Sequence, residues 1–190
     1  MPAITSVSGP REACAKIVHG LMLPVVSIVG KSKSGKTTLL ELLIAELRSR
    51  GYRLAAIKHT YHFTMDQPGK DSWRLREAGC QTVILSSPEK MALVKQTEQE
   101  ATLEELLCLI GDGVDLVITE GFKRAKNPKI EVHRTGGGAL ACPPEELLAV
   151  VTDEALDINL PQYSHTDAKG LADLIESTVL ASRVREREKD

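Results

Sequence analysis

Residues 25–37 have the sequence VVSIVGKSKSGKT, and this stretch decides the fold. Val25–Val29 is a β-branched apolar run without helical periodicity, which is typical of a strand buried on both faces. Gly30–Thr37 then satisfies G-x-x-x-x-G-K-[ST], and the apolar positions that follow, as far as about Arg50, recur at helical spacing. A strand, a glycine-rich loop and a helix in this order predict a phosphate-binding loop.

Each residue type in the loop has a physical role in holding a polyphosphate. Gly30 and Gly35 permit torsions that turn successive N–H groups toward phosphate oxygens, and the helix N-terminus adds partial positive charge. Lys36, the predicted catalytic cation, is expected to bind the β and γ oxygens, and the Thr37 hydroxyl to ligate Mg²⁺. An ordinary glycine turn before a helix is the plainer alternative, but it does not require Lys-Thr at the helix start. The residues expected to line the nucleotide here are Gly30, Lys31, Ser32, Lys33, Ser34, Gly35, Lys36, Thr37 and Thr38.

A magnesium site also needs a carboxylate at the carboxyl edge of a neighbouring parallel strand. Glu120 closes the apolar run Leu116–Thr119, and we predict that it is both the metal ligand and a catalytic group. Asp115 begins the same run and is expected at the opposite edge of the sheet. Asp66 and Asp71 are alternative metal neighbours, although Asp71 is more simply explained as a helix cap.

The rest of the chain alternates short apolar runs with amphipathic segments. Strands are expected at 54–57, 82–85, 91–94, 116–119, 130–133 and 147–151, with a hairpin between the second and third. Helices are expected from Asp71 to Gly79, over 103–110, and after a cap at Asp167. This order predicts an α/β, three-layer P-loop NTPase fold with a largely parallel central sheet and helices on both faces. The expected parts are a polar N-terminal extension (1–22), the nucleotide-binding domain (23–182) and a charged tail (183–190).

Composition excludes several classes of protein. The 190 residues are 42% hydrophobic and 26% charged, which suits one sizeable core. The net charge of −2 disfavours a broadly basic nucleic-acid-binding protein. No run approaches the roughly 20 apolar residues of a membrane helix, and no signal-peptide core precedes the first strand. We therefore expect a cytoplasmic protein that binds neither nucleic acid nor membrane.

Three further motifs follow the phosphate loop: Lys58-His59-Thr60, Pro68-Gly69-Lys70-Asp71-Ser72 and Glu120-Gly121-Phe122-Lys123. In this order the set resembles the MobB family, the molybdopterin-guanine dinucleotide biosynthesis adapter proteins, over residues 24–180. The resemblance implies a P-loop protein that binds GTP with Mg²⁺ and forms a homodimer. It also implies association with the MobA-type nucleotidyltransferase that joins GMP to molybdopterin, and a role in carrying or presenting molybdopterin.

The same resemblance assigns roles to single residues. Glu120 and Gly121 are implied to face the metal and the phosphates, and His59 to line the adjoining surface. Lys31 falls at the position of a signature lysine that, in dimeric relatives of this P-loop branch, reaches the partner's nucleotide. Ser32-Lys33 replaces the paired glycines of that variant, which favours a solvated lysine instead.

Base choice and the anionic partner rest on weaker patterns. The guanine-reading N-K-x-D is absent, but Asp153 follows a strand and could accept two hydrogen bonds from guanine; a simple turn residue is the alternative. His59, Tyr61 and His62 could contact a pterin or could simply be exposed. A basic cluster suits an anionic partner or is solvated charge, and consists of Lys123, Arg124, Lys126, Lys129, His133 and Arg134.

Three functions fit these patterns. The first is an adapter in molybdenum cofactor maturation with weak Mg²⁺-dependent GTPase activity, because no glutamine or arginine is evidently placed to assist hydrolysis. The second is a small-molecule kinase that uses ATP, although no arginine-rich lid is evident. The third is a module that holds nucleotide without hydrolysing it.

Overall fold

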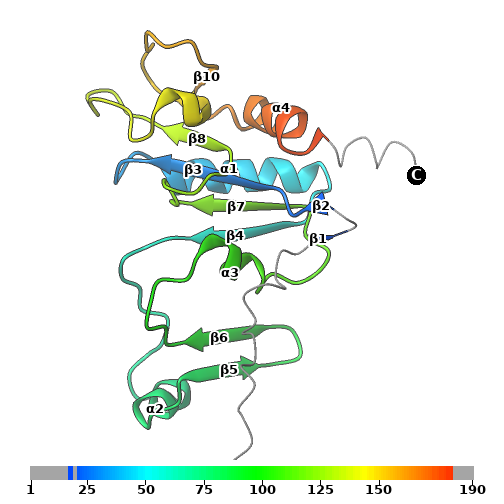
Figure 1. Cartoon of the computed structure of the whole chain (residues 1–190), viewed down its shortest axis with the longest axis vertical. Coiled ribbons are helices and arrows are strands. Elements are labelled where there is room, and N and C mark those ends of the chain that lie inside the picture. The colour runs from blue at the N-terminus through cyan, green and yellow to red at the C-terminus, as the bar shows by residue number, and fades with distance from the viewer. Residues whose placement is uncertain (1–16, 19–20, 182–190) are drawn as a thin grey trace, which may run out of the picture. The chain divides into compact units, whose positions relative to one another are not determined.

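The computed structural model describes residues 17–18 and 21–181 (Figure 1). The expected charged tail, 183–190, and most of the expected N-terminal extension lie outside the described residues. Ile17–Val18 (β1) and Leu21–Met22 (β2) form a short antiparallel pair. The chain divides into two compact units, one formed by residues up to His59 together with those from Leu103 onward, and the other by Thr60–Thr102.

A six-stranded sheet organises the first unit, with strand order β10-β9-β8-β3-β7-β4 (Figure 1). Every neighbouring pair in it is parallel, which confirms the prediction of a largely parallel sheet. The short β10 strand was not expected from the sequence because only two residues pair. The strands are Val25–Gly30 (β3), Leu54–Lys58 (β4), Leu116–Glu120 (β7), Lys129–Val132 (β8), Leu147–Val151 (β9) and Gln162–Tyr163 (β10).

Two helices cover one face of this sheet. Lys36–Ser49 (α1) and Ala168–Thr178 (α4) pack on alternate strand residues such as Ile28, Ile118 and Val132, as the twofold side-chain period of a strand requires. The opposite face buries a smaller cluster of Val29, Cys142, Leu147 and Val150 beneath the loop that contains the 3₁₀ turn Pro144–Glu146 (η1).

The two helices are also joined by a charged residue at the end of α1. Arg50 Nη1 donates hydrogen bonds of 2.6 Å to Asp173 Oδ1 and 2.7 Å to Glu176 Oε2, both on α4. Gly51 follows in a left-handed conformation with φ of 86°, as is common for the glycine just after a helix. At the start of α4, Asp167 accepts a 2.9 Å bond from Gly170 N–H, as the predicted cap should. These contacts fix how α1 leaves the phosphate loop.

The helix before β7 is shorter than expected. It spans only Leu103–Leu107 (α3), whereas the sequence predicts a helix as far as residue 110. The backbone bonds of Leu109 N–H to Leu106 and of Ile110 N–H to Leu107 join residues three apart, so the last turn tightens and the α-helix ends.

The second unit contains one helix and one hairpin. Thr82–Ser86 (β5) and Met91–Lys95 (β6) pair antiparallel, which confirms the predicted hairpin. The prediction that Asp71 caps the preceding helix, Asp71–Glu77 (α2), is wrong: Lys70 is the capping residue and makes no side-chain bond. Asp71 is the first helical residue, because the turn through Pro68-Gly69 delivers the chain one residue earlier.

Asp66 has a structural task in the same unit. Its carboxylate accepts a 2.7 Å bond from Ser72 Oγ and lies 3.1 Å from Arg76 Nε, so it holds the turn before α2 onto the helix. Along the described residues, no helix is long and apolar enough to cross a bilayer. The cytoplasmic location stays a prediction.

Candidate functional site: the phosphate loop and the carboxyl edge of the sheet

The loop between β3 and α1 requires glycine at its first position. Gly30 has φ of 140°, and a Cβ built there would lie 2.4 Å from the carbonyl oxygen of Val132 on β8. Gly35, just before α1, has φ of 97°, and Lys33 also adopts the left-handed conformation, with φ of 62°. The loop therefore turns tightly around its own backbone amides.

Most of these amides make no hydrogen bond within the described part of the chain. Ser34 N–H donates a 3.4 Å bond to the Lys31 carbonyl, but the amides of Ser32, Lys33, Gly35 and Lys36 have no hydrogen-bond partner within the described part of the chain. The buried Ser34 hydroxyl also lacks a partner among the described residues. Buried polar groups normally find hydrogen bonds, so this cradle fits a ligand with several acceptor oxygens, such as a phosphate.

Lys36 lies across the mouth of this cradle. Its Nζ donates bonds of 2.6 Å to the Lys31 carbonyl and 3.3 Å to the Gly30 carbonyl. Burial lowers the pKa of the ammonium; Glu120 opposes this shift, and the positive charges of Lys123 and Lys58 add to it. An anion in the loop would relieve this unfavourable environment.

Glu120 meets the loop from the neighbouring strand. Its Oε2 accepts a 3.0 Å bond from Thr37 Oγ1 and lies 3.1 Å from Lys58 Nζ. The structure thus brings together the two residues predicted to hold Mg²⁺, a hydroxyl and a carboxylate, which are oxygen ligands of the kind that Mg²⁺ prefers. Asp115 lies at the other end of β7, as predicted, and there holds Arg53 through a 2.8 Å bond to its N–H.

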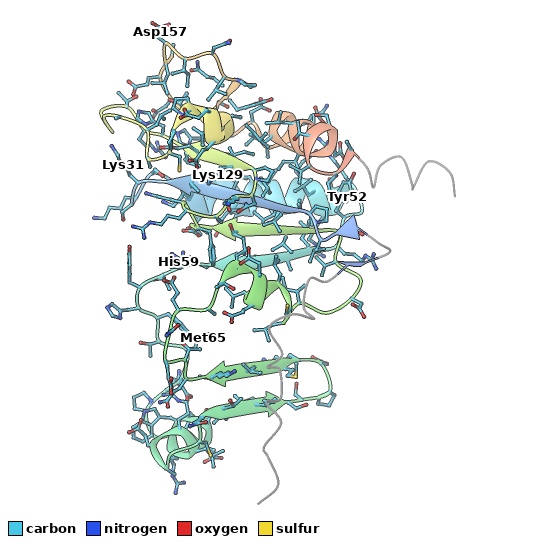
Figure 2. All side chains as sticks on the ribbon, viewed as in Figure 1. Lys31, Tyr52, His59, Met65, Lys129 and Asp157 are labelled. Carbon is cyan, nitrogen blue, oxygen red and sulfur yellow. The ribbon has the colours of Figure 1, made fainter. Side chains whose placement is uncertain are left out.

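The turn after Glu120 is supported by His59. Gly121 has φ of 103° and Phe122 has φ of 55°, and the Phe122 ring packs on the His59 ring at a centroid distance of 5.1 Å. A Cβ on Gly121 would lie 3.0 Å from His59 Cβ, so glycine is needed for this close approach. Figure 2 shows His59 and Lys31 at the carboxyl ends of the strands. His59 is therefore at the predicted edge, in contact with the Glu120 turn.

Lys31 is bound to the protein. Its Nζ donates a hydrogen bond to the Gly137 carbonyl, in the loop that follows β8. The side chain is exposed, as expected for a solvated lysine, and the glycine-rich turn at 136–138 comes close enough to offer it a carbonyl.

Asp153 and its neighbours stand on the β8–β9 side of the loop. Asp153 Oδ1 accepts bonds from Thr135 N–H, at 2.7 Å, and from Thr135 Oγ1, at 2.9 Å, and these bonds lower the pKa of its carboxyl group. Arg134 donates from Nε to the Ser34 carbonyl at 3.3 Å and lies 3.5 Å from Asp153 Oδ2. No sequence pattern indicates this link, because residues 100 positions apart meet only when β8 pairs with β3.

Two members of the predicted basic cluster are not available to a partner. Lys129 is 3% exposed and pairs with Glu146 at 2.8 Å, and it begins β8, away from the carboxyl ends of the strands (Figure 2). His133 is 5% exposed, with its Nε2 lying 3.0 Å from Glu154 Oε1. The cluster interpretation is wrong for these two residues because β8 is buried on both faces and the residue that follows it is buried as well. Lys123, Arg124, Lys126 and Arg134 remain exposed.

Two other candidate residues lie in a different unit of the chain. Tyr61 and His62 belong to the second compact unit and are exposed. Within the described ranges there is no group of three or more His, Cys, Asp or Glu side chains arranged to hold a metal ion. A cation at Thr37 and Glu120 would therefore complete its shell with phosphate oxygens and water.

The comparisons with known proteins show the family of this chain. The family model described as molybdopterin guanine dinucleotide synthesis protein B, MobB, matches residues 25–153, from the β3 strand to Asp153. The chain belongs to the MobB family. It is 40% identical over 158 residues to the molybdopterin-guanine dinucleotide biosynthesis adapter protein of Haemophilus influenzae, covering 82% of this chain and 89% of the relative. Against the adapter protein of Escherichia coli it is 38% identical over 164 residues, covering 81% and 92%.

Solved MobB structures share the fold. A crystal structure of molybdopterin-guanine biosynthesis protein B aligns with a TM-score of 0.63 and 32% identity, covering 80% of this chain and 98% of the other. The Bacillus subtilis MobB crystal structure aligns with a TM-score of 0.65 and 26% identity, covering 82% and 98%. The P-loop NTPase fold expected from the sequence is therefore confirmed, with a mostly parallel sheet and flanking helices.

Proposed function

We propose that this MobB-family adapter of molybdopterin guanine dinucleotide biosynthesis binds GTP with Mg²⁺ in the loop Gly30–Thr37 and hydrolyses it slowly. One observation carries the proposal: open backbone amides, a desolvated lysine and a hydroxyl–carboxylate pair meet at one end of β3. No simpler ligand than a metal-bound polyphosphate uses all three.

Each group has a distinct task. The loop amides and the Ser34 hydroxyl bind phosphate oxygens, and Lys36 exchanges its bonds to loop carbonyls for bonds to the phosphates. Thr37 and Glu120 would hold Mg²⁺, which when bound neutralises phosphate charge and polarises the terminal phosphoryl group. Slow turnover is expected because these residues supply position and charge but no general base that is free of other partners.

Guanine recognition is proposed for Asp153. Its Oδ1 is engaged by Thr135, and its Oδ2 has only a 3.5 Å contact with Arg134. A carboxylate has lone pairs on both oxygens, so Oδ2 can accept from the N1 and N2 hydrogens of guanine.

The partners follow from what the relatives are called. They are named as adapter proteins, and we propose that this chain forms a homodimer and presents molybdopterin to a MobA-type nucleotidyltransferase. Affinity capture of purified nucleotidyltransferase and molybdopterin, with and without GTP and Mg²⁺, tests this. Capture of neither under any condition would remove the adapter assignment for this chain.

Titration of a fluorescent GTP analogue with Mg²⁺ tests the nucleotide site itself. Lys36→Ala should weaken binding by roughly tenfold to a hundredfold, because charge-assisted bonds to phosphate are lost. Lys169→Ala, which removes an exposed lysine on α4, is the matched control and should bind normally. Equal binding by both variants would reject the site. A phosphorylated small molecule formed from ATP would favour a kinase instead.

A further inference from the structure

Lys58 reaches the candidate site from a different strand than the phosphate loop. It is the last residue of β4, the edge strand of the sheet, and pairs in register with Glu120 on β7. Its Nζ lies 3.1 Å from Glu120 Oε2, although the side chain is 59% exposed. The ammonium is therefore fixed at one point only and is free to move elsewhere on a flexible stem.

Positive charge exceeds negative charge around this point. Lys36 experiences the positive charges of Lys58 and Lys123 and the negative charges of Glu120 and Glu131. Three ammonium groups against two carboxylates leave an excess of 3 − 2 = 1 positive charge. This excess favours an anionic ligand at this point.

The Glu120 oxygen cannot serve all its partners once a cation is present. Oε2 already accepts from Thr37 and Lys58. A Mg²⁺ held by Thr37 and Glu120 places a second cation on that oxygen, and like charges at such a distance repel. Lys58 is the partner that can leave, because Thr37 is fixed at the start of α1.

The place of Lys58 in the sheet determines which end of a bound nucleotide its side chain can reach. The β7 and β4 strands lie on one side of β3, and β8 and β9, with Asp153 at the end of β9, lie on the other. If the base lies toward Asp153, the terminal phosphate points toward Glu120 and Lys58. The nearest anion for a displaced Lys58 is then that terminal phosphate.

We propose that Lys58 is a specificity-determining residue that moves from Glu120 to the terminal phosphate and makes the site favour GTP over GDP. This rests on the proposed function, in which the loop holds a magnesium-bound guanine nucleotide. Lys58 thereby supplies the positive charge at the terminal phosphate for which the sequence shows no evidently placed arginine. It does so only when a third phosphate is present.

Isothermal titration of the full chain with Mg²⁺-GTPγS and with Mg²⁺-GDP separates the possibilities. Lys58→Gln should lower the affinity for GTPγS about tenfold, the size of one lost charge-assisted bond, and leave GDP affinity within about twofold. Lys58→Arg should retain most of the preference. Lys169→Gln, which changes an exposed lysine on α4, is the matched control and should behave as the unmodified chain.

The outcomes also distinguish this inference from the proposed function. Equal loss of GTPγS and GDP binding in Lys58→Gln, or no loss of either, overturns the role of Lys58 while the loop still binds nucleotide. If the unmodified chain binds neither nucleotide, or if Lys36→Ala binds both normally, the proposed function itself fails. Retained GDP binding in Lys58→Gln shows at the same time that the variant is folded.

Discussion

Thr37 Oγ1 donates a 3.0 Å hydrogen bond to Glu120 Oε2, joining the first turn of α1 to the end of β7 across 83 positions of sequence. The bond exists because β3 and β7 are parallel neighbours, so the loop after one and the carboxylate closing the other meet at the same edge. A hydroxyl and a carboxylate that already share a proton are correctly spaced to share a small divalent cation instead.

The first prediction concerns this pair. Thr37→Val removes the hydroxyl at nearly constant volume and should abolish most of the gain in nucleotide affinity that Mg²⁺ provides, leaving Mg²⁺-free binding little changed. Thr178→Val, on the exposed side of α4, is the matched control. Titrations with and without Mg²⁺ measure the ratio of the two nucleotide affinities. An unchanged ratio in Thr37→Val would place the metal elsewhere.

The second prediction concerns the first glycine of the loop. In Gly30→Ala the new methyl group would meet the Val132 carbonyl at 2.4 Å, in addition to the backbone strain at φ of 140°. We expect a loss of about 3 kcal/mol in the free energy of unfolding, from strain plus overpacking. Nucleotide binding should be lost as well.

Gly51→Ala is the control for strain alone. Gly51 has φ of 86°, but nothing lies within 4 Å of a Cβ placed there. Its cost should be about 1 kcal/mol, with nucleotide binding intact. Urea unfolding of the two variants makes the comparison, and equal costs would show that the contact with Val132 relaxes freely.

The sequence predicted most of the first unit because its signals are local. The β-branched run before Gly30, the four-residue spacing in α1 and the glycine at 51 each act within a few residues. The same holds for Glu120, whose place at the carboxyl end of a buried strand follows from the pattern of that strand alone. The pairing register of β7 with β3 then places Glu120 next to Thr37.

What the sequence could not show depends on pairing between distant segments. In the sequence Lys129 and His133 look like surface charge, and only their positions at the start of β8 and just after it reveal their partners. Lys31 likewise finds the Gly137 carbonyl 106 positions away. The prediction that Asp71 caps α2 was wrong for a local reason, since several residues near Pro68 could equally begin the helix.

The third prediction contrasts the two ends of β7. Asp115 is 5% exposed and accepts from Arg53 N–H at 2.8 Å and from its guanidinium at 3.0 Å. Asp115→Ala strands a buried amide and should reduce the free energy of unfolding by about 2–3 kcal/mol. Arg53→Ala should cost less than about 1 kcal/mol because the guanidinium is largely exposed. Folded Asp115→Ala should still bind nucleotide, unlike a variant of Glu120.

The fourth prediction concerns pH. Burial lowers the pKa of Lys36 in the free protein, and bound phosphates should raise it again. Below the free-state pKa the ammonium is present in both forms, so this group adds no pH dependence. Above it, binding must take up a proton, so affinity should fall by up to about tenfold per pH unit, beginning below the ordinary value of 10.5.

The free energy of unfolding of the nucleotide-free protein should change with pH in the opposite direction, and rise. Between the lowered folded-state pKa and 10.5 the unfolded chain binds more protons at Lys36, so the penalty for burying the ammonium fades as pH rises.

Calorimetry of nucleotide binding in two buffers of different ionisation enthalpy, at about pH 9, reports the proton uptake on binding. Lys36→Arg should show none, and equal uptake in that variant would assign the proton to another group.

The fifth prediction tests base recognition. Asp153→Asn replaces an acceptor with a donor toward the base, while its amide oxygen can still accept from Thr135. GTP affinity should fall roughly tenfold to a hundredfold, as expected for the loss of hydrogen bonds to a charged acceptor, and affinity for xanthosine triphosphate should rise. Thr135→Val, which removes only the hydroxyl bond to Asp153, should preserve the preference for guanine. Equal losses of GTP and ATP binding in Asp153→Asn would instead identify Asp153 as a residue that shapes the turn after β9.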